Sequence, residues 1–159
     1  MKKSKSIKRG LGFGLASGII TTLGLIIGLY FSTYSKIIVI EGILIIALID
    51  ALSDAFGMHL SEEFALKSDK HVFKTMAYTF FFKLIFALSF LIFIIPFSNT
   101  LAIILSTIYG LILIAILSYY IAKSEKIDVD KVIMQHLLLG VIVILLSFGI
   151  GKMLNVLLR

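Results

Sequence analysis

The chain lacks cysteine altogether, has a single proline and carries few charged residues among its 159 positions. The absence of cysteine excludes a scaffold held together by disulfides. Only 15% of the residues are charged and 60% are hydrophobic, whereas soluble domains average roughly 25% charged and 45–50% apolar residues. This composition excludes a water-soluble single domain and a disordered chain. We therefore expect an integral membrane protein.

Five continuously apolar segments are long enough to cross a bilayer as helices, since one span needs roughly 20 residues. Because apolar residues do not alternate with polar ones, membrane helices are favoured over barrel strands. The one proline, Pro96, lies at the end of the third segment, where a helix can stop at little cost. The sequence thus predicts an all-α, polytopic protein in which residues 1–159 form one membrane domain. The predicted spans are 11–34, 37–60, 75–97, 100–122 and 132–155.

Basic residues set the predicted orientation of these spans. Eleven lysines and arginines lie at the N-terminus and in the second-to-third and fourth-to-fifth connections, which all fall on one side. The other side has only Lys36, Lys152 and Arg159. The positive-inside rule then predicts a cytoplasmic N-terminus and an external C-terminus, with Tyr119 and Tyr120 in the inner aromatic belt. Topology and attraction to anionic membrane lipid explain the net charge of +6, so we expect no nucleic-acid partner.

Four ionisable side chains lie inside the predicted spans: Glu41, Asp50 and Asp54 in the second and Lys83 in the third. Each charge near the bilayer centre costs about 2.5–3.5 kcal/mol, so such groups usually face a partner or a water-filled cavity. By helical rise, Lys83 lies about 4–5 Å inward of the midplane, between the two aspartates in depth. A pairing is allowed, and it leaves one surplus negative charge for a proton or a cation. A purely structural ion pair is the alternative.

The second span gathers its polar residues on one face. Asp50 and Asp54 lie ~40° apart around the helix axis, and Glu41 lies on the opposite side. His59 and Glu62 are three residues apart at the cytoplasmic end, where they either share a ligand or are ordinary interfacial residues. The candidate metal ligands are Asp50, Asp54, Met58, His59 and Glu62. The candidate ion-pathway residues are Ser17, Thr21, Ser53 and Lys83.

The first span is rich in glycine. Gly10, Gly14 and Gly18 repeat every four residues, and Gly24 and Gly28 follow. Small residues at this spacing permit close helix approach, either within the chain or across a homodimer.

Two segments resemble the vacuolar iron transporter family. Residues 17–24, SGIITTLG, are similar to that family's first-span signature, in which an aspartate precedes the glycine. Residues 51–61, ALSDAFGMHLS, resemble its second-span motif, and residues 136–151 are similar to its fifth span. The chain departs from the family in having Ser17 in place of the aspartate, Asp54 in place of a methionine and Met58 in place of a glutamate. The cytoplasmic metal-binding helices that many members carry after the second span are missing.

The resemblance implies a homodimer in the membrane that moves Fe²⁺ or Mn²⁺ out of the cytoplasm in exchange for protons, along a pathway lined by the first two helices. Carboxylates suit such ions, and a thioether or imidazole favours Fe²⁺ over Mg²⁺. We therefore expect a transporter of the prokaryotic cell membrane, with the metal as substrate and no cofactor. The alternatives are a proton-coupled exporter of an organic cation and a non-transporting membrane subunit. No phosphate loop, zinc motif or serine elbow indicates an enzyme.

Overall fold

Every regular element of the protein is a helix in the computed structural model, which describes residues 2–65 and 68–158. The predicted all-α class is confirmed. Most helices begin before or end after the predicted spans, because helical structure continues into the polar flanks, but the third predicted span is divided at Phe90 and its helical part ends at Ile94. The helices are α1 (Lys2–Thr33), α2 (Lys36–Phe64), α3 (Asp69–Ser89), the short α4 (Leu91–Ile94), α5 (Asn99–Glu125) and α6 (Val129–Leu157).

Two side-chain caps and the single proline account for three of the helix ends. Ser35 accepts a hydrogen bond from the backbone N–H of Ile38 at the start of α2, and Asp128 accepts one from Lys131 at the start of α6. A break at Phe90 separates α3 from α4, whose last residue is Ile94. Pro96 follows in a turn, as the sequence predicts.

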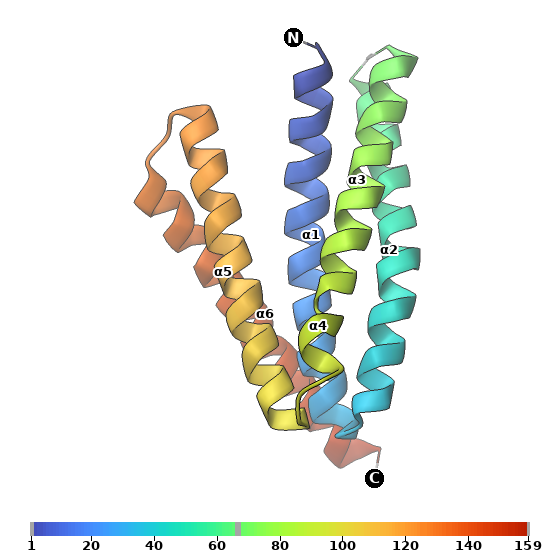
Figure 1. The fold of residues 1–159 in the computed structure, drawn as a ribbon, viewed down its shortest axis with the longest axis vertical. Coiled ribbons are helices and arrows are strands. Elements are labelled where there is room, and N and C mark those ends of the chain that lie inside the picture. The colour runs from blue at the N-terminus through green and yellow to red at the C-terminus, as the bar shows by residue number, and fades with distance from the viewer. Residues whose placement is uncertain (1, 66–67, 159) are drawn as a thin grey trace.

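Among the described residues, four helical segments are long and apolar enough to cross a membrane: Lys8–Thr33, Asp69–Ile94, Asn99–Glu125 and Val129–Leu157. These segments indicate a multi-pass membrane protein. The predicted second span, α2, is not among the four, and it carries the acidic residues Glu41, Asp50 and Asp54. It nevertheless runs antiparallel to α1 and beside α3 (Figure 1). A five-span topology therefore stays a prediction.

Helix α1 occupies the centre of the bundle. Helices α2 and α3 pack on one side of it and the α5–α6 hairpin on the other (Figure 1). The hairpin leans away from α1 toward the end of the bundle where the N-terminus lies, and the C-terminus lies at the opposite end. Ile19, Leu23, Ile26 and Phe90 are fully buried among these helices and form the middle of the apolar core.

The glycine stripe of α1 lies against α3. A Cβ atom added at Gly10 would lie 2.5 Å from the Cβ of Tyr78, and one at Gly14 would lie 2.6 Å from the carbonyl oxygen of Thr79. At Gly18 it would lie 3.1 Å from the carbonyl oxygen of Lys83. These distances show that the backbones of α1 and α3 are nearly in contact, at a seam that we call the glycine seam.

The other small residues of α1 contact α6. A Cβ atom at Gly24 would meet Ser147 and Val143 at 3.1 Å, and one at Gly151 would lie 2.6 Å from the carbonyl oxygen of Gly28. Both glycine faces of α1 are thus occupied within the chain. Intrachain packing therefore uses these glycines, and a homodimer stays a prediction.

Candidate functional site

Four polar side chains from three helices meet in what we call the aspartate–lysine cluster. Its members are Ser17 of α1, Asp50 and Asp54 of α2, and Lys83 of α3. The ammonium of Lys83 lies 2.5 Å from Oδ2 of Asp50, contacts Oδ2 of Asp54 and donates to the Ser17 hydroxyl at 2.9 Å. Ser17 in turn donates to Oδ2 of Asp54 at 2.5 Å. The predicted pairing of Lys83 with both aspartates is therefore confirmed.

Burial differs sharply between the two signs of charge. Only 1% of the Lys83 side chain is exposed, whereas the side chains of Asp50 and Asp54 are 27% and 21% exposed. An ammonium so far from water needs charged partners, and the two carboxylates supply them. The carboxylates also reach the surface of the three-helix unit, so the cluster is accessible from its acidic side.

Small residues on all three helices bring this cluster together. The glycine seam holds α1 against α3, and a Cβ atom at Gly18 would lie 3.3 Å from Cγ of Lys83. On α2, the buried positions Ala47, Ala51 and Ala55 repeat every four residues, and this helix packs against both α1 and α3. The small side chains shorten the distance between helix axes, so the side chain of Lys83 reaches both neighbours.

The remaining predicted pathway residues lie around the cluster rather than in it. Thr21 is half-buried, and its hydroxyl donates to the backbone oxygen of Ser17 at 2.8 Å, one turn earlier in α1. Ser53 is exposed on α2. Glu41, which the sequence places on the opposite side of this helix from Asp50, is exposed as well. The predicted polar face of α2 is therefore split, with its aspartates turned toward α3 and Ser53 turned outward.

A second polar cluster lies nearer the N-terminal end of α1, and we call it the Glu62 cluster. The Glu62 side chain is only 3% exposed, and its Oε1 contacts the guanidinium of Arg9. Its Oε2 lies 3.0 Å from Nε2 of His71. The Glu62 cluster therefore connects α1, α2 and α3 at a second position along their length, in addition to the aspartate–lysine cluster.

Arg9 and His71 are the partners that the sequence reasoning missed. One signal was present: Glu62 follows the buried Ala55 by seven residues, which places both within ~20° of each other on α2. That position marks Glu62 as an inward-facing acid in need of a partner. Nothing in the sequence indicated which basic residues of α1 and α3 would reach it.

The five predicted metal ligands do not form one group. Asp50 and Asp54 face Lys83, Glu62 faces Arg9 and His71, and Nε2 of His59 lies 3.3 Å from the exposed Glu63. Met58 is partly buried, one turn beyond Asp54. Throughout the described part of the chain, no three histidine or acidic side chains converge to hold a metal ion. The grouping of all five around one ion is therefore not observed.

The chain was compared with known protein families, curated proteins and solved structures. No protein-family model, no curated protein and no solved structure matches the chain.

Proposed function

We propose that the protein is a cation transporter of the cell membrane and that the aspartate–lysine cluster is its substrate site. One observation carries this proposal: a buried ammonium, that of Lys83, lies between two partly exposed carboxylates. Ionisable residues within membrane spans usually mark ion or substrate pathways. In this arrangement Lys83 occupies, in the resting protein, the position that a transported cation takes during the cycle.

Charge balance supports an exchange reaction at this cluster. Two carboxylates and one ammonium leave one surplus negative charge, which a proton or a cation can balance. A divalent cation carries the two positive charges that match the two carboxylates, so it replaces the ammonium of Lys83 as their partner, and any proton on the carboxylates leaves. Since metal ligands must lose their protons to bind, uptake of the ion releases protons, and this coupling is the basis of antiport.

The ligand set favours Fe²⁺ or Mn²⁺ as substrate. Asp50, Asp54 and Ser17 offer three side chains that bind through oxygen, the ligand type that suits hard and borderline divalent ions. The thioether of Met58, one turn from Asp54, adds a softer ligand for an ion on its way to or from the cytoplasm. The direction that the family resemblance implies is export from the cytoplasm, in a five-span topology with a cytoplasmic N-terminus. The same resemblance implies a homodimer as the working unit.

The decisive test is flux in proteoliposomes. Wild type is compared with the double variant Asp50→Asn, Asp54→Asn, with Fe²⁺ or Mn²⁺ supplied on one side and internal pH recorded. We expect metal flux with opposite proton movement in wild type and its loss in the folded variant. Equal flux in both proteins would show that the aspartates are structural and would refute this site.

One observation favours a second candidate, a non-transporting membrane subunit. The aspartate–lysine cluster joins three helices through hydrogen bonds and ion pairs. Such contacts can hold the helices together without any role in transport. Thermal unfolding in detergent separates the two candidates, because a ligand that binds the native state raises its apparent stability. A midpoint that rises with Mn²⁺ supports transport. An unchanged midpoint together with a partner that co-purifies in fixed ratio supports the subunit.

A further inference from the structure

The two carboxylates of the aspartate–lysine cluster are held in different ways. Oδ2 of Asp54 accepts two hydrogen bonds, one from the Ser17 hydroxyl at 2.5 Å and one from the ammonium of Lys83. Oδ2 of Asp50 lies 2.5 Å from the same ammonium, yet this buried oxygen accepts no hydrogen bond. Both hydrogen bonds that the cluster donates to a carboxylate therefore go to Asp54.

Charge balance gives the two aspartates different positions in the resting protein. Lys83, Asp54 and Ser17 form a closed unit in which each side chain is hydrogen-bonded to the other two, with one positive and one negative charge. A buried ammonium needs partners of this kind. Asp50 carries the surplus negative charge of the cluster, and it is the more exposed of the two carboxylates. It can therefore take a new partner without the loss of a hydrogen bond.

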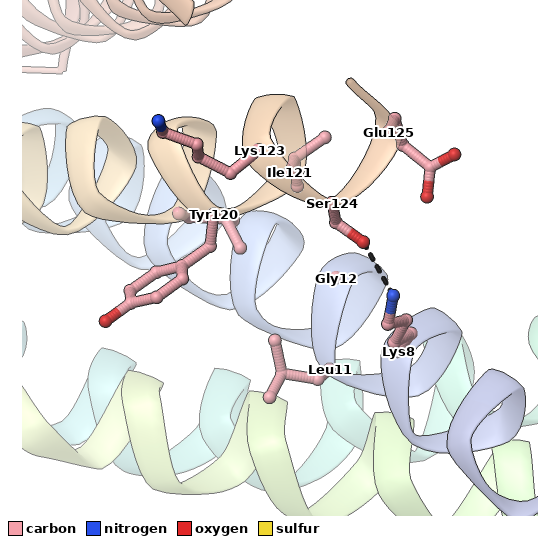
Figure 2. A pocket seen from close by; sticks show the side chains of 9 residues that line it. Lys8, Leu11, Gly12, Tyr120, Ile121, Lys123, Ser124 and Glu125 are labelled. Atoms are coloured by element: carbon pink, nitrogen blue, oxygen red, sulfur yellow. Dashed lines mark hydrogen bonds between the residues drawn. The ribbon is translucent and has the colours of Figure 1, made fainter. Parts of the chain in front are cut away.

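Room for such a partner exists on the exposed side of α2. A pocket of about 560 Å³ between α1 and α5 does not lead to the cluster, because residues of these two helices alone line it and none belongs to the cluster (Figure 2). On α2, Ser53 and Gly57 follow Asp50 by three and seven residues, so they share its side of the helix. Ser53 is exposed, and a Cβ atom at Gly57 would meet nothing within 4 Å. These small residues leave space for a cation beside Asp50.

We propose that Asp50 is the ligand that receives the incoming divalent cation, and that Asp54 is a positioning residue that holds Lys83 until the cation has bound. This assignment rests on the proposed transport function and divides its substrate site into two parts. The cation first binds Asp50, while Lys83 keeps its hydrogen bonds to Asp54 and Ser17. Lys83 then leaves, and Asp54 becomes the second carboxylate ligand. The first step requires no competition with the hydrogen bonds of Lys83.

The test compares Asp50→Asn with Asp54→Asn in detergent, and Glu41→Gln, an exposed acid of the same helix, is the matched control. Circular dichroism gives the melting temperature without metal, and isothermal titration gives the affinity for Mn²⁺. Asp54→Asn should lower the melting temperature by roughly 5 °C or more, because Lys83 loses its hydrogen-bonded carboxylate, and Asp50→Asn by less than about 2 °C. Asp50→Asn should weaken Mn²⁺ binding by roughly tenfold or more, and by more than Asp54→Asn does. The control should change neither quantity.

A double variant shows whether Asp54 acts through Lys83. Adding Lys83→Met to Asp54→Asn removes the ammonium that Asp54 holds, so it should restore folding and most of the lost melting temperature, even if Asp54→Asn alone does not fold. The absence of this rescue would overturn the proposal. So would equal losses of melting temperature in the two aspartate variants, or a larger loss of Mn²⁺ affinity in Asp54→Asn than in Asp50→Asn. Failure of the proposed function is distinguishable, because wild type would then bind no Mn²⁺ at all.

Discussion

Lys83 is the central residue of the aspartate–lysine cluster. Its side chain is almost fully buried, and its ammonium contacts two carboxylates and a hydroxyl from two other helices. Removing one member of a buried ion pair commonly costs about 3–5 kcal/mol, because the remaining charge stays uncompensated. Here the remaining groups would be two carboxylates, the arrangement that a divalent cation stabilises best.

Lys83→Met should therefore raise the affinity of the resting protein for Mn²⁺. A hydrogen bond to a charged group contributes about 1.5–3 kcal/mol, so loss of this competitor should strengthen binding roughly ten- to a hundredfold. Isothermal titration in detergent measures the effect, with Lys131→Met as the matched exposed control. A folded Lys83→Met protein that binds Mn²⁺ more weakly than wild type would contradict the displacement mechanism.

Ser17 and Ser53 make a matched pair for testing which serine belongs to the cluster. Ser17→Ala removes one bond donated to Asp54 and one accepted from Lys83, whereas Ser53 lies on the exposed side of α2. We expect Ser17→Ala to lower the free energy of unfolding by about 1–2 kcal/mol and Ser53→Ala to leave it unchanged. Circular dichroism melts in detergent compare the two. Equal melting temperatures would argue against a structural contribution from Ser17.

At the scale of elements, the seam between α1 and α3 is built from backbone rather than from large side chains. The glycines of α1 face Thr75 and Thr79, and both threonine hydroxyls bond to carbonyl oxygens one turn earlier in their own helix. The threonine atoms nearest to Gly10 and Gly14 are backbone atoms. Close packing of this kind drives helix association in lipid, where the hydrophobic effect contributes little between helices.

Gly14→Ala should separate the two helices, because its Cβ would lie 2.6 Å from the carbonyl oxygen of Thr79. Overpacking of this kind costs about 1–3 kcal/mol. Gly12→Ala is the control: its Cβ meets open space, and alanine is up to about 1 kcal/mol more favourable than glycine within a helix. We expect a lower melting temperature for the first variant and an equal or higher one for the second. The reverse order would refute the seam.

At the scale of the whole molecule, packing and composition disagree on whether α2 crosses the membrane. Composition leaves it out of the four membrane-spanning segments, yet it runs antiparallel to α1 and contacts α1 and α3. The termini lie at opposite ends of the bundle, which an odd number of crossings produces (Figure 1). We propose that α2 crosses the membrane, with Lys83 as the charged partner of its two aspartates.

The topology can be tested with single cysteines, because the chain has none of its own. Asn99→Cys, at the start of α5, should react with an impermeant maleimide added to intact cells. Ser68→Cys and Lys131→Cys, at the other end of the bundle, should react only after permeabilisation. Labelling of Ser68→Cys in intact cells would place the end of α2 outside and exclude five spans with a cytoplasmic N-terminus.

Much of the fold was predictable, because long apolar runs leave helices as the only option and basic flanks mark their ends. Helix geometry alone also predicted that Lys83 could pair with Asp50 and Asp54. The Glu62 cluster was not foreseen, because its Arg9 and His71 contacts depend on the rotation of α1 and α3 about their axes. The sequence also could not predict that the α1 glycines pack against α3 and α6 of the same chain, since the spacing of glycines alone does not identify the partner helix.

The position of Lys83 on α3 has a consequence for biosynthesis. Lys83 follows Asp54 by 29 residues, so at about 5–20 residues per second it leaves the ribosome about 1.5–6 s later. Until then α2 carries two uncompensated carboxylates, each costing about 2.5–3.5 kcal/mol in lipid. We expect α2 to wait at the translocon and enter the bilayer together with α3 as a hairpin. In a glycosylation-mapping assay, Lys83→Leu should then reduce insertion of α2, although α3 itself becomes more apolar.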